Sequence, residues 1–189
     1  METLNMILPV SERSLRVLAV AAFALSLVAT APFAIASGDD TKSDANQTCP
    51  KGQVWDAKTK KCVEKKSGVL PDEALTDYAY ALAKAERYNE ALDVLDTLQN
   101  PNTAKALNYR GYATRKLGHT QEGVSYYLKS VALDPSYTKV REYLGEAYVI
   151  QGKLDLAKDQ LATIAKLCGS TQCEEYGDLS QAITKAQGL

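Results

Sequence analysis

The sequence has few of the residues from which catalytic and metal sites are built. It contains one histidine, one tryptophan and four cysteines among 189 residues. It also lacks a charge excess, because 22 Lys and Arg stand against 23 Asp and Glu, and this excludes a general nucleic-acid binder. No GxSxG, Walker A, HExxH or dinucleotide-binding motif is present. The lone histidine, His119, has no accompanying nucleophile or acid motif, so we interpret it as an exposed loop residue.

These absences predict a protein that is not an enzyme. We expect no catalytic residue, no cofactor and no resident metal, and we do not expect a small-molecule ligand. The 46% hydrophobic content is nevertheless enough for a packed core. A function in binding another molecule is therefore the class to examine.

An apolar run near the N-terminus predicts export. Residues 17–36 carry no charge, follow Arg13 and Arg16, and end in Ala34-Ile35-Ala36 before a polar stretch. This pattern is typical of a signal peptide, so we expect residues 1–36 to be cleaved after Ala36 and the mature chain to be periplasmic. A membrane anchor is the alternative, because about 20 apolar residues can span a bilayer. Pro32, the abundance of alanine and the absence of a following Lys or Arg argue against it.

The four cysteines form two pairs that are each local in the sequence. Exported cysteines usually form disulfides, and of the three possible connectivities we favour Cys49–Cys62 and Cys168–Cys173. Zinc is an alternative, but the spacings lack the CxxC unit of ordinary structural zinc sites. The same absence argues against a redox role.

Ahead of the main part of the chain, the sequence predicts a flexible linker and a small hairpin. Residues 37–48 are small, polar and unpatterned, which is typical of a linker. Within residues 49–66 a type I turn starting at Asp56 is expected to join two short strands. A lone hairpin is marginal in water, and a disulfide closing a loop of about 15 residues adds about 3 kcal/mol.

Residues 104–137 and 138–171 repeat one another at a spacing of 34 positions. The shift places Gly111 over Gly145, Gly118 over Gly152, and Gly123 over Ala157. Leu144-Gly145 with Tyr148, and the later run 130–135 (SVALDP), also follow motifs of the tetratricopeptide repeat (TPR) family. The chain therefore resembles that family. A more degenerate copy covers 72–103, with Glu86 where the other copies have glycine.

This resemblance implies an all-α fold. We expect a helix-turn-helix TPR solenoid of three repeats (72–103, 104–137 and 138–171), preceded by the stapled β-hairpin and followed by a C-terminal capping helix over 172–189. Small residues at the helix crossing allow close approach, and Gly118 and Gly152 suit the left-handed turn that ends a helix. Thr171 and Glu174 have the spacing of a capping box, which predicts where the last helix starts. The combination resembles small exported bacterial TPR proteins with a Cys-bounded hairpin.

The resemblance also implies a concave peptide-binding groove lined by the first helix of each repeat. Acidic Glu142 and Glu146 fall at groove positions. The Lys and Asn of the carboxylate clamp of chaperone-binding relatives are replaced by Thr76 and Tyr80, so that clamp is not expected. An alternative is that some of the tyrosines only bridge adjacent repeats. The candidate groove residues are Tyr80, Lys105, Asn108, Tyr109, Tyr112, Arg115, Lys116, Lys139 and Tyr143.

Two functions follow as hypotheses. The first is a non-enzymatic periplasmic adaptor or scaffold whose Tyr-rich groove binds a peptide segment of another envelope protein. The second is a cell-wall or glycan-associated protein in which Trp55 of the basic hairpin contacts a sugar. Trp55 has a structural alternative, which is packing against the first repeat, where residues 72–96 hold seven acids and two cations. Neither function involves nucleic acid, and a membrane enters only if the leader is not cleaved.

Overall fold

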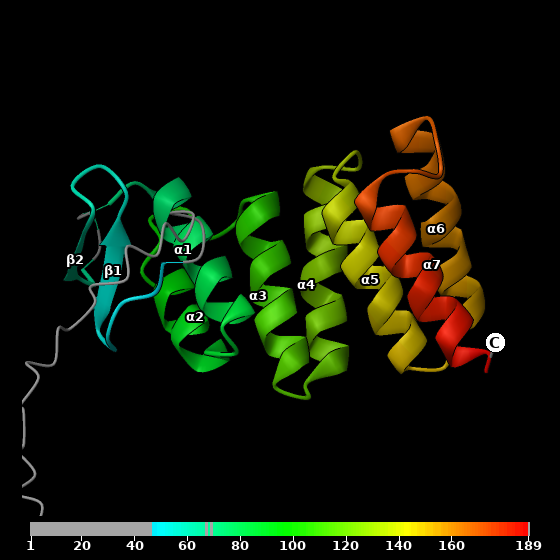
Figure 1. Ribbon diagram of the computed structural model, residues 1–189, viewed down its shortest axis with the longest axis horizontal. Helices are drawn as coiled ribbons and strands as arrows, with labels where there is room; N and C mark the ends of the chain where they lie inside the picture. Colours follow the sequence, from blue (N-terminus) through cyan, green and yellow to red (C-terminus); the bar gives the residue numbers. More distant parts are fainter. Residues whose placement is uncertain (1–46, 67, 69, 189) are drawn as a thin grey trace, which may run out of the picture. The chain divides into compact units, whose positions relative to one another are not determined.

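In the computed structural model, the described residues are 47–66, 68 and 70–188. The predicted signal peptide (1–36) and most of the predicted linker (37–46) lie outside the described residues. Within the described part, no helix has the length and apolar character needed to cross a membrane. The two strands are β1 (Gln53–Asp56) and β2 (Lys61–Glu64). Figure 1 shows the seven helices that follow them, α1 (Asp72–Lys84), α2 (Tyr88–Leu95), α3 (Ala104–Lys116), α4 (Thr120–Leu133), α5 (Thr138–Ile150), α6 (Leu154–Cys168) and α7 (Glu174–Ala186).

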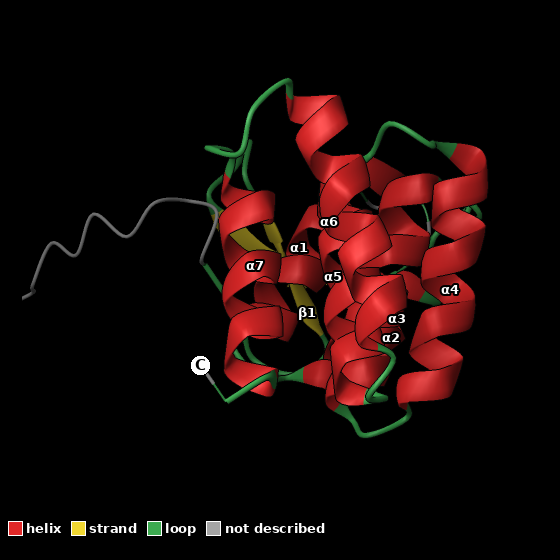
Figure 2. Ribbon diagram, turned by 90° about the vertical axis from the view of Figure 1, so that its right-hand side faces the viewer, coloured by secondary structure: helices red, strands yellow, loops and turns green. Residues whose placement is uncertain are grey.

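The helices confirm the predicted solenoid. They pack as three consecutive pairs, α1 with α2, α3 with α4, and α5 with α6, and the first helices α1, α3 and α5 also contact one another in series. In Figure 2 the α6–α7 end of this array faces the viewer and the strands lie behind the helices. One side of the array is therefore formed by first helices alone, and this is the side on which a groove was predicted.

Glycines set the spacing between α3 and α4. A Cβ added at Gly123 would lie 2.9 Å from the carbonyl oxygen of Gly111, and one at Gly111 would lie 2.6 Å from the ring of Tyr127. Because Tyr127 is fully buried, its ring has no free space to move into. The predicted role of small residues at the crossing is therefore confirmed in the second repeat.

All three repeats use the same turn between their helices. A backbone bond spans five residues in each turn, from Arg87 N to Leu82 O, from His119 N to Thr114 O and from Lys153 N to Tyr148 O. The turn residue has a left-handed φ in each, +94° at Gly118 and +71° at Gly152. Glu86 takes the same conformation with φ +61°. A side chain is strained there because its Cβ crowds the backbone.

The N-terminal hairpin is present and is stapled as predicted. Strands β1 and β2 are antiparallel, with Trp55 opposite Cys62, and a disulfide joins Cys49 to Cys62. The side chain of Asp56 closes the turn, because its carboxylate accepts bonds from the Lys58 N–H at 2.9 Å and the Thr59 hydroxyl at 2.7 Å. Val54 is completely buried, so the hairpin contributes to the core.

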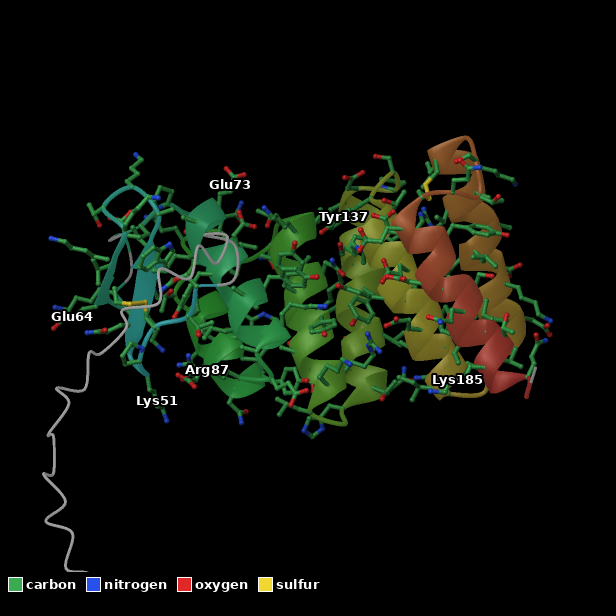
Figure 3. The ribbon with its side chains drawn as sticks, viewed as in Figure 1. Lys51, Glu64, Glu73, Arg87, Tyr137 and Lys185 are labelled. Carbon is green, nitrogen blue, oxygen red and sulfur yellow. A yellow bond between two sulfur atoms is a disulfide. The ribbon has the colours of Figure 1, made fainter. Side chains whose placement is uncertain are left out.

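Polar contacts fix the hairpin to the first repeat. The Cys49 N–H donates to the Tyr78 hydroxyl at 2.7 Å, and the Arg87 guanidinium donates to the Cys49 carbonyl at 2.7 Å. Arg87 also makes two bonds to Glu90, at 2.8 and 2.7 Å. These bonds join the root of the hairpin to both helices of the first pair, and Figure 3 labels Arg87 where they meet.

Helix α7 covers the other end of the array, but it begins later than the capping box predicted. The N-cap residue is Cys173, which a disulfide holds to Cys168, and its side chain makes no capping bond. Thr171 is therefore not the N-cap of this helix, which begins two residues after the predicted start. Leu179 and Ile183 anchor α7 in the core.

Gly145 leaves space for a side chain of this end helix. The three atoms that a Cβ at Gly145 would approach most closely all belong to Leu179, the nearest at 2.5 Å. The repeat pattern predicted space there for the partner helix of the same repeat. The structure uses it for α7, which packs on α5 as a further first helix would.

Candidate functional site

Four tyrosines from three successive first helices form a continuous layer. The ring of Tyr80 on α1 stacks on Tyr109 of α3, with centroids 4.3 Å apart and planes 14° apart. Tyr112 lies edge-on to Tyr80 at 6.2 Å and against Tyr143 of α5 at 4.9 Å. The hydroxyls of Tyr80 and Tyr143 are hydrogen-bonded at 3.0 Å. We call these four residues the tyrosine layer.

The tyrosine layer binds the repeats to one another. Tyr109, Tyr112 and Tyr143 are 9%, 8% and 4% exposed, so little of each side chain reaches solvent. Burial raises the pKa of Tyr112 to about 12. This geometry matches the alternative in which the tyrosines bridge adjacent repeats, and it makes the layer a rigid floor.

Lysines lie over this floor. The ammonium of Lys84 is 6.0 Å from the ring centroid of Tyr80, that of Lys116 is 5.5 Å from Tyr112, and that of Lys139 is 5.9 Å from Tyr143. These distances are within cation–π range. Lys84 and Lys116 are exposed, and no carboxylate among the described residues pairs with either of them.

Three predicted groove residues instead make contacts within the protein. Arg115 is only 7% exposed, and it donates to the Tyr127 hydroxyl at 3.1 Å and to the Glu146 carboxylate at 2.6 Å. Asn108 is fully buried and donates to the Tyr137 hydroxyl at 3.1 Å. Lys105 pairs with Asp77 at 2.6 Å. The sequence positions gave the correct helix for each residue, but they did not show which side chains would be used in packing.

Acidic side chains complete the opposite wall. Glu142 is 2% exposed, and its carboxylate lies 3.0 Å from the Lys139 ammonium, which also reaches Glu174 of α7 at 3.2 Å. Burial raises the pKa of Glu142 to about 7, and the charges of Glu146 and Asp178 act in the same direction. Glu174 and Asp178 were not among the predicted residues. They line the site because α7 packs on α5 in the way that the first helix of a fourth repeat would. The sequence signal that could have identified them was the helical spacing of residues 174–186.

A cleft of about 190 Å³ joins these walls over the tyrosine layer. Five of the nine predicted groove residues line it, namely Tyr80, Tyr112, Lys116, Lys139 and Tyr143. The other four, Lys105, Asn108, Tyr109 and Arg115, do not. The lining is completed by Lys84, Glu142, Glu146, Glu174 and Asp178.

Trp55 lies at the edge of a second hollow. Its partly exposed ring packs against the core, which agrees with the structural alternative, and it also lines a hollow of about 500 Å³ between the hairpin and α1.

The described residues contain one group with metal-ligand types close together, Cys168, Cys173 and Glu175. Both sulfurs of this group are in the disulfide, so they are not free as thiolate ligands.

Comparisons with known proteins identify the fold. No protein-family model and no curated protein sequence matches the chain. Among solved structures, the Yersinia enterocolitica type III secretion translocator chaperone SycD is 17% identical, with a TM-score of 0.51, over 62% of this chain and 89% of its own. The first TPR domain of human RPAP3 is 24% identical, with a TM-score of 0.50, over 62% and 95%. MamA from Desulfovibrio magneticus RS-1 is 25% identical, with a TM-score of 0.48, over 53% of this chain and 58% of its own length. The likenesses to SycD and RPAP3 show that this chain has a TPR fold.

Proposed function

We propose that this chain is a non-enzymatic periplasmic adaptor that binds a peptide segment of another envelope protein in the cleft over its tyrosine layer. The observation that carries the proposal is the unpaired cationic side of that cleft. Lys84 and Lys116 stand on the first helices of successive repeats, α1 and α3, over a rigid aromatic floor, and neither has a carboxylate partner among the described residues. A preorganised surface of this kind loses little entropy on binding.

The charges define the partner segment. The α1–α3 side offers two lysines, whereas Glu146, Glu174 and Asp178 stand on the α5–α7 side. Glu146 and Glu174 already pair with Arg115 and Lys139, so the lysines are the less satisfied charges. An extended segment with Asp or Glu toward α1 and α3 is the best electrostatic match.

The periplasmic part of the proposal is supported by the leader-like residues 1–36 and by the two disulfides, which persist in oxidising compartments. An alkaline phosphatase fusion after Asp40 is expected to be active, and the mature N-terminus is expected to be Ser37. Retention of residues 1–36 in the purified protein would refute cleavage.

The adaptor function is tested by placing a photo-crosslinking amino acid in the cleft. Incorporation at Lys116 should give a discrete adduct with one envelope protein in living cells. The matched control is Lys158, an exposed lysine on α6 that lies outside the cleft. Absence of an adduct from Lys116, or the same adduct from both positions, would refute the groove as the binding surface.

A second candidate function is glycan binding at Trp55. It is favoured by one observation, that the partly exposed ring lines a hollow that also contains carboxylates. Retention of the protein on purified peptidoglycan, lost in Trp55→Ala but not in a Lys84→Ala, Lys116→Ala double variant, would establish it in place of the adaptor function.

A further inference from the structure

The hollow beside Trp55 is formed by an element that does not belong to the repeats. Trp55 and Ala57 of the hairpin form one wall, and Glu73, Asp77 and Tyr80 of α1 form the other. Its volume of about 500 Å³ is within the roughly 300–1,000 Å³ range of ligand sites. Tyr80 lines both this hollow and the cleft over the tyrosine layer, so one tyrosine side chain borders both spaces.

Both walls of the hollow are held rigidly. On the hairpin side, the Tyr78 hydroxyl and Arg87 bind the backbone of Cys49, whose disulfide partner Cys62 pairs with Trp55 across the strands. On the helix side, Tyr80 is fixed by its stack on Tyr109 and its bond to Tyr143. The aromatic walls are therefore in place before any partner binds, which lowers the entropic cost of binding.

Two features of the walls remain unsatisfied. The indole N–H of Trp55 is covered and has no hydrogen-bond partner among the described residues, which is unfavourable for a buried donor. Glu73 is exposed, and no described cation pairs with it. No Lys, Arg or His lines the hollow. Of its two carboxylates, Asp77 is paired with Lys105 at 2.6 Å, so Glu73 is the one without a cationic partner among the described residues.

We infer that this hollow docks a partner segment in which a bulky apolar side chain is directly followed by Lys or Arg. The apolar side chain would fill the space between Trp55 and Tyr80, and the cation would lie against Glu73. The inference rests on the proposed adaptor function. It adds a second contact with the partner, which prefers a cation, whereas the lysine-rich cleft prefers an anion.

The test uses the emission of Trp55, which is the only tryptophan of the chain. The protein, purified after expression from its full-length sequence, is titrated with blocked pentapeptides that contain Leu-Lys, Leu-Glu or Ala-Lys at their centre. We expect the Leu-Lys peptide to shift the emission saturably and to bind at least tenfold more tightly than the other two. Equal binding of all three, or no response to any, would overturn the inference.

Two further probes separate the other possible occupants. A tetramer of N-acetylglucosamine is expected to leave the emission unchanged, and a peptide with the sequence of residues 37–46 is expected not to compete. A saturable response to the glycan alone would replace the inference with a sugar site. Competition by the 37–46 peptide would assign the hollow to the chain's own linker.

Variants tie the response to the hollow. Glu73→Gln should weaken Leu-Lys binding about fivefold, while Asp159→Asn, a carboxylate-to-amide change at an exposed position on α6, should leave it unchanged. Ala74→Leu, which fills the hollow, should abolish binding without lowering the melting temperature by more than a few degrees. Unchanged binding in Glu73→Gln and Ala74→Leu would overturn the inference. The Lys116 crosslink reports only on the cleft, so failure there and failure here are distinguishable.

Discussion

At its N-terminal end the helical array is covered by a two-stranded hairpin, whereas at its C-terminal end it is covered by a helix. One disulfide lies within the hairpin region and joins Cys49 to Cys62, whereas the other joins the end of α6 to the residue before α7. The hairpin buries Val54 and packs further side chains against the core, and Tyr78 and Arg87 bind the backbone of Cys49. Helix α7 buries Leu179 and Ile183 and follows the packing of the repeats.

This difference shows how the two apolar ends of an array of only three repeats can be covered. A repeat cannot bury its apolar face alone, so both ends need a cover. A covering element that continues the helical packing, such as α7, is stabilised mainly by burial of its apolar side chains. A covering element with a different structure, such as the hairpin, needs a covalent constraint to keep its own fold. The hairpin also leaves space, because its flat strands do not interdigitate with α1 as another helix would. The hollow beside Trp55 is the result.

The largest expected difference between the ends is in the loss of their disulfides. A Cys49→Ala, Cys62→Ala variant should lose about 3 kcal/mol of unfolding free energy, and a Cys168→Ala, Cys173→Ala variant about 2 kcal/mol, because its loop is shorter. The hairpin should also detach locally, since a lone hairpin is marginal. In the first variant only, the emission of Trp55 should therefore shift at an earlier stage of unfolding than the circular dichroism of the helices at 222 nm. Coincident transitions in both variants would show that the hairpin does not depend on its staple.

The buried acid beside α7 should make the C-terminal end sensitive to pH. The pKa of Glu142 is raised from 4.5 to about 7 in the folded protein by burial. Its contribution to stability is therefore fully present below pH 4.5 and is lost as the pH rises through 7. Between pH 5 and pH 8 this loss is on the order of 2 kcal/mol.

Urea denaturation of Glu142→Gln across that range measures the effect. The variant cannot ionise, so its unfolding free energy should change less between pH 5 and pH 8 than that of the wild type. Glu175→Gln, a partly exposed acid at the same end of the molecule, is the control. Identical pH profiles for wild type and Glu142→Gln would contradict the prediction.

Two glycines test whether α7 packs as a repeat helix. Gly145→Ala should cost about 2 kcal/mol, because the added Cβ would meet the buried Leu179. Gly177→Ala, on α7 itself, meets nothing within 4 Å and should stabilise the helix by up to about 1 kcal/mol. Thermal unfolding of both variants is the measurement. A Gly145→Ala variant as stable as wild type would show that α7 does not pack closely on α5.

The smallest expected effect concerns the repeat nearest the hairpin. Glu86→Gly should raise the unfolding free energy by about 1 kcal/mol, because glycine adopts the left-handed φ of this turn without strain. Gly118→Glu, the reverse change at the equivalent turn, should lower it by a similar amount. Both are measured by urea denaturation, and a lower midpoint for Glu86→Gly would mean that the side chain contributes a contact that outweighs the strain.

Much of the fold was readable because its signals are local. Residues close in sequence determine the turn glycines at 118 and 152 and the turn at Asp56, and the 34-residue period can be read from the sequence directly. A sequence pattern therefore identifies these features without knowledge of distant neighbours. The start of α7 was predicted two residues too early, because the spacing of Thr171 and Glu174 shows that a capping box is compatible with the sequence but not that its bonds form. The predicted leader and linker lie outside the described residues and stay predictions.

The sequence by itself determined which helices form the concave side and which residue types stand on them. Only the tertiary structure decided which of those side chains remain available. Arg115 and Asn108 occupy groove positions, yet they are buried because Tyr127, Glu146 and Tyr137 from other elements bind them. Lys84 and Lys116 stay exposed over the tyrosine layer. Helical spacing gives the direction of a side chain, but its burial depends on the size and chemistry of what packs opposite, and that is set by contacts between residues far apart in the chain.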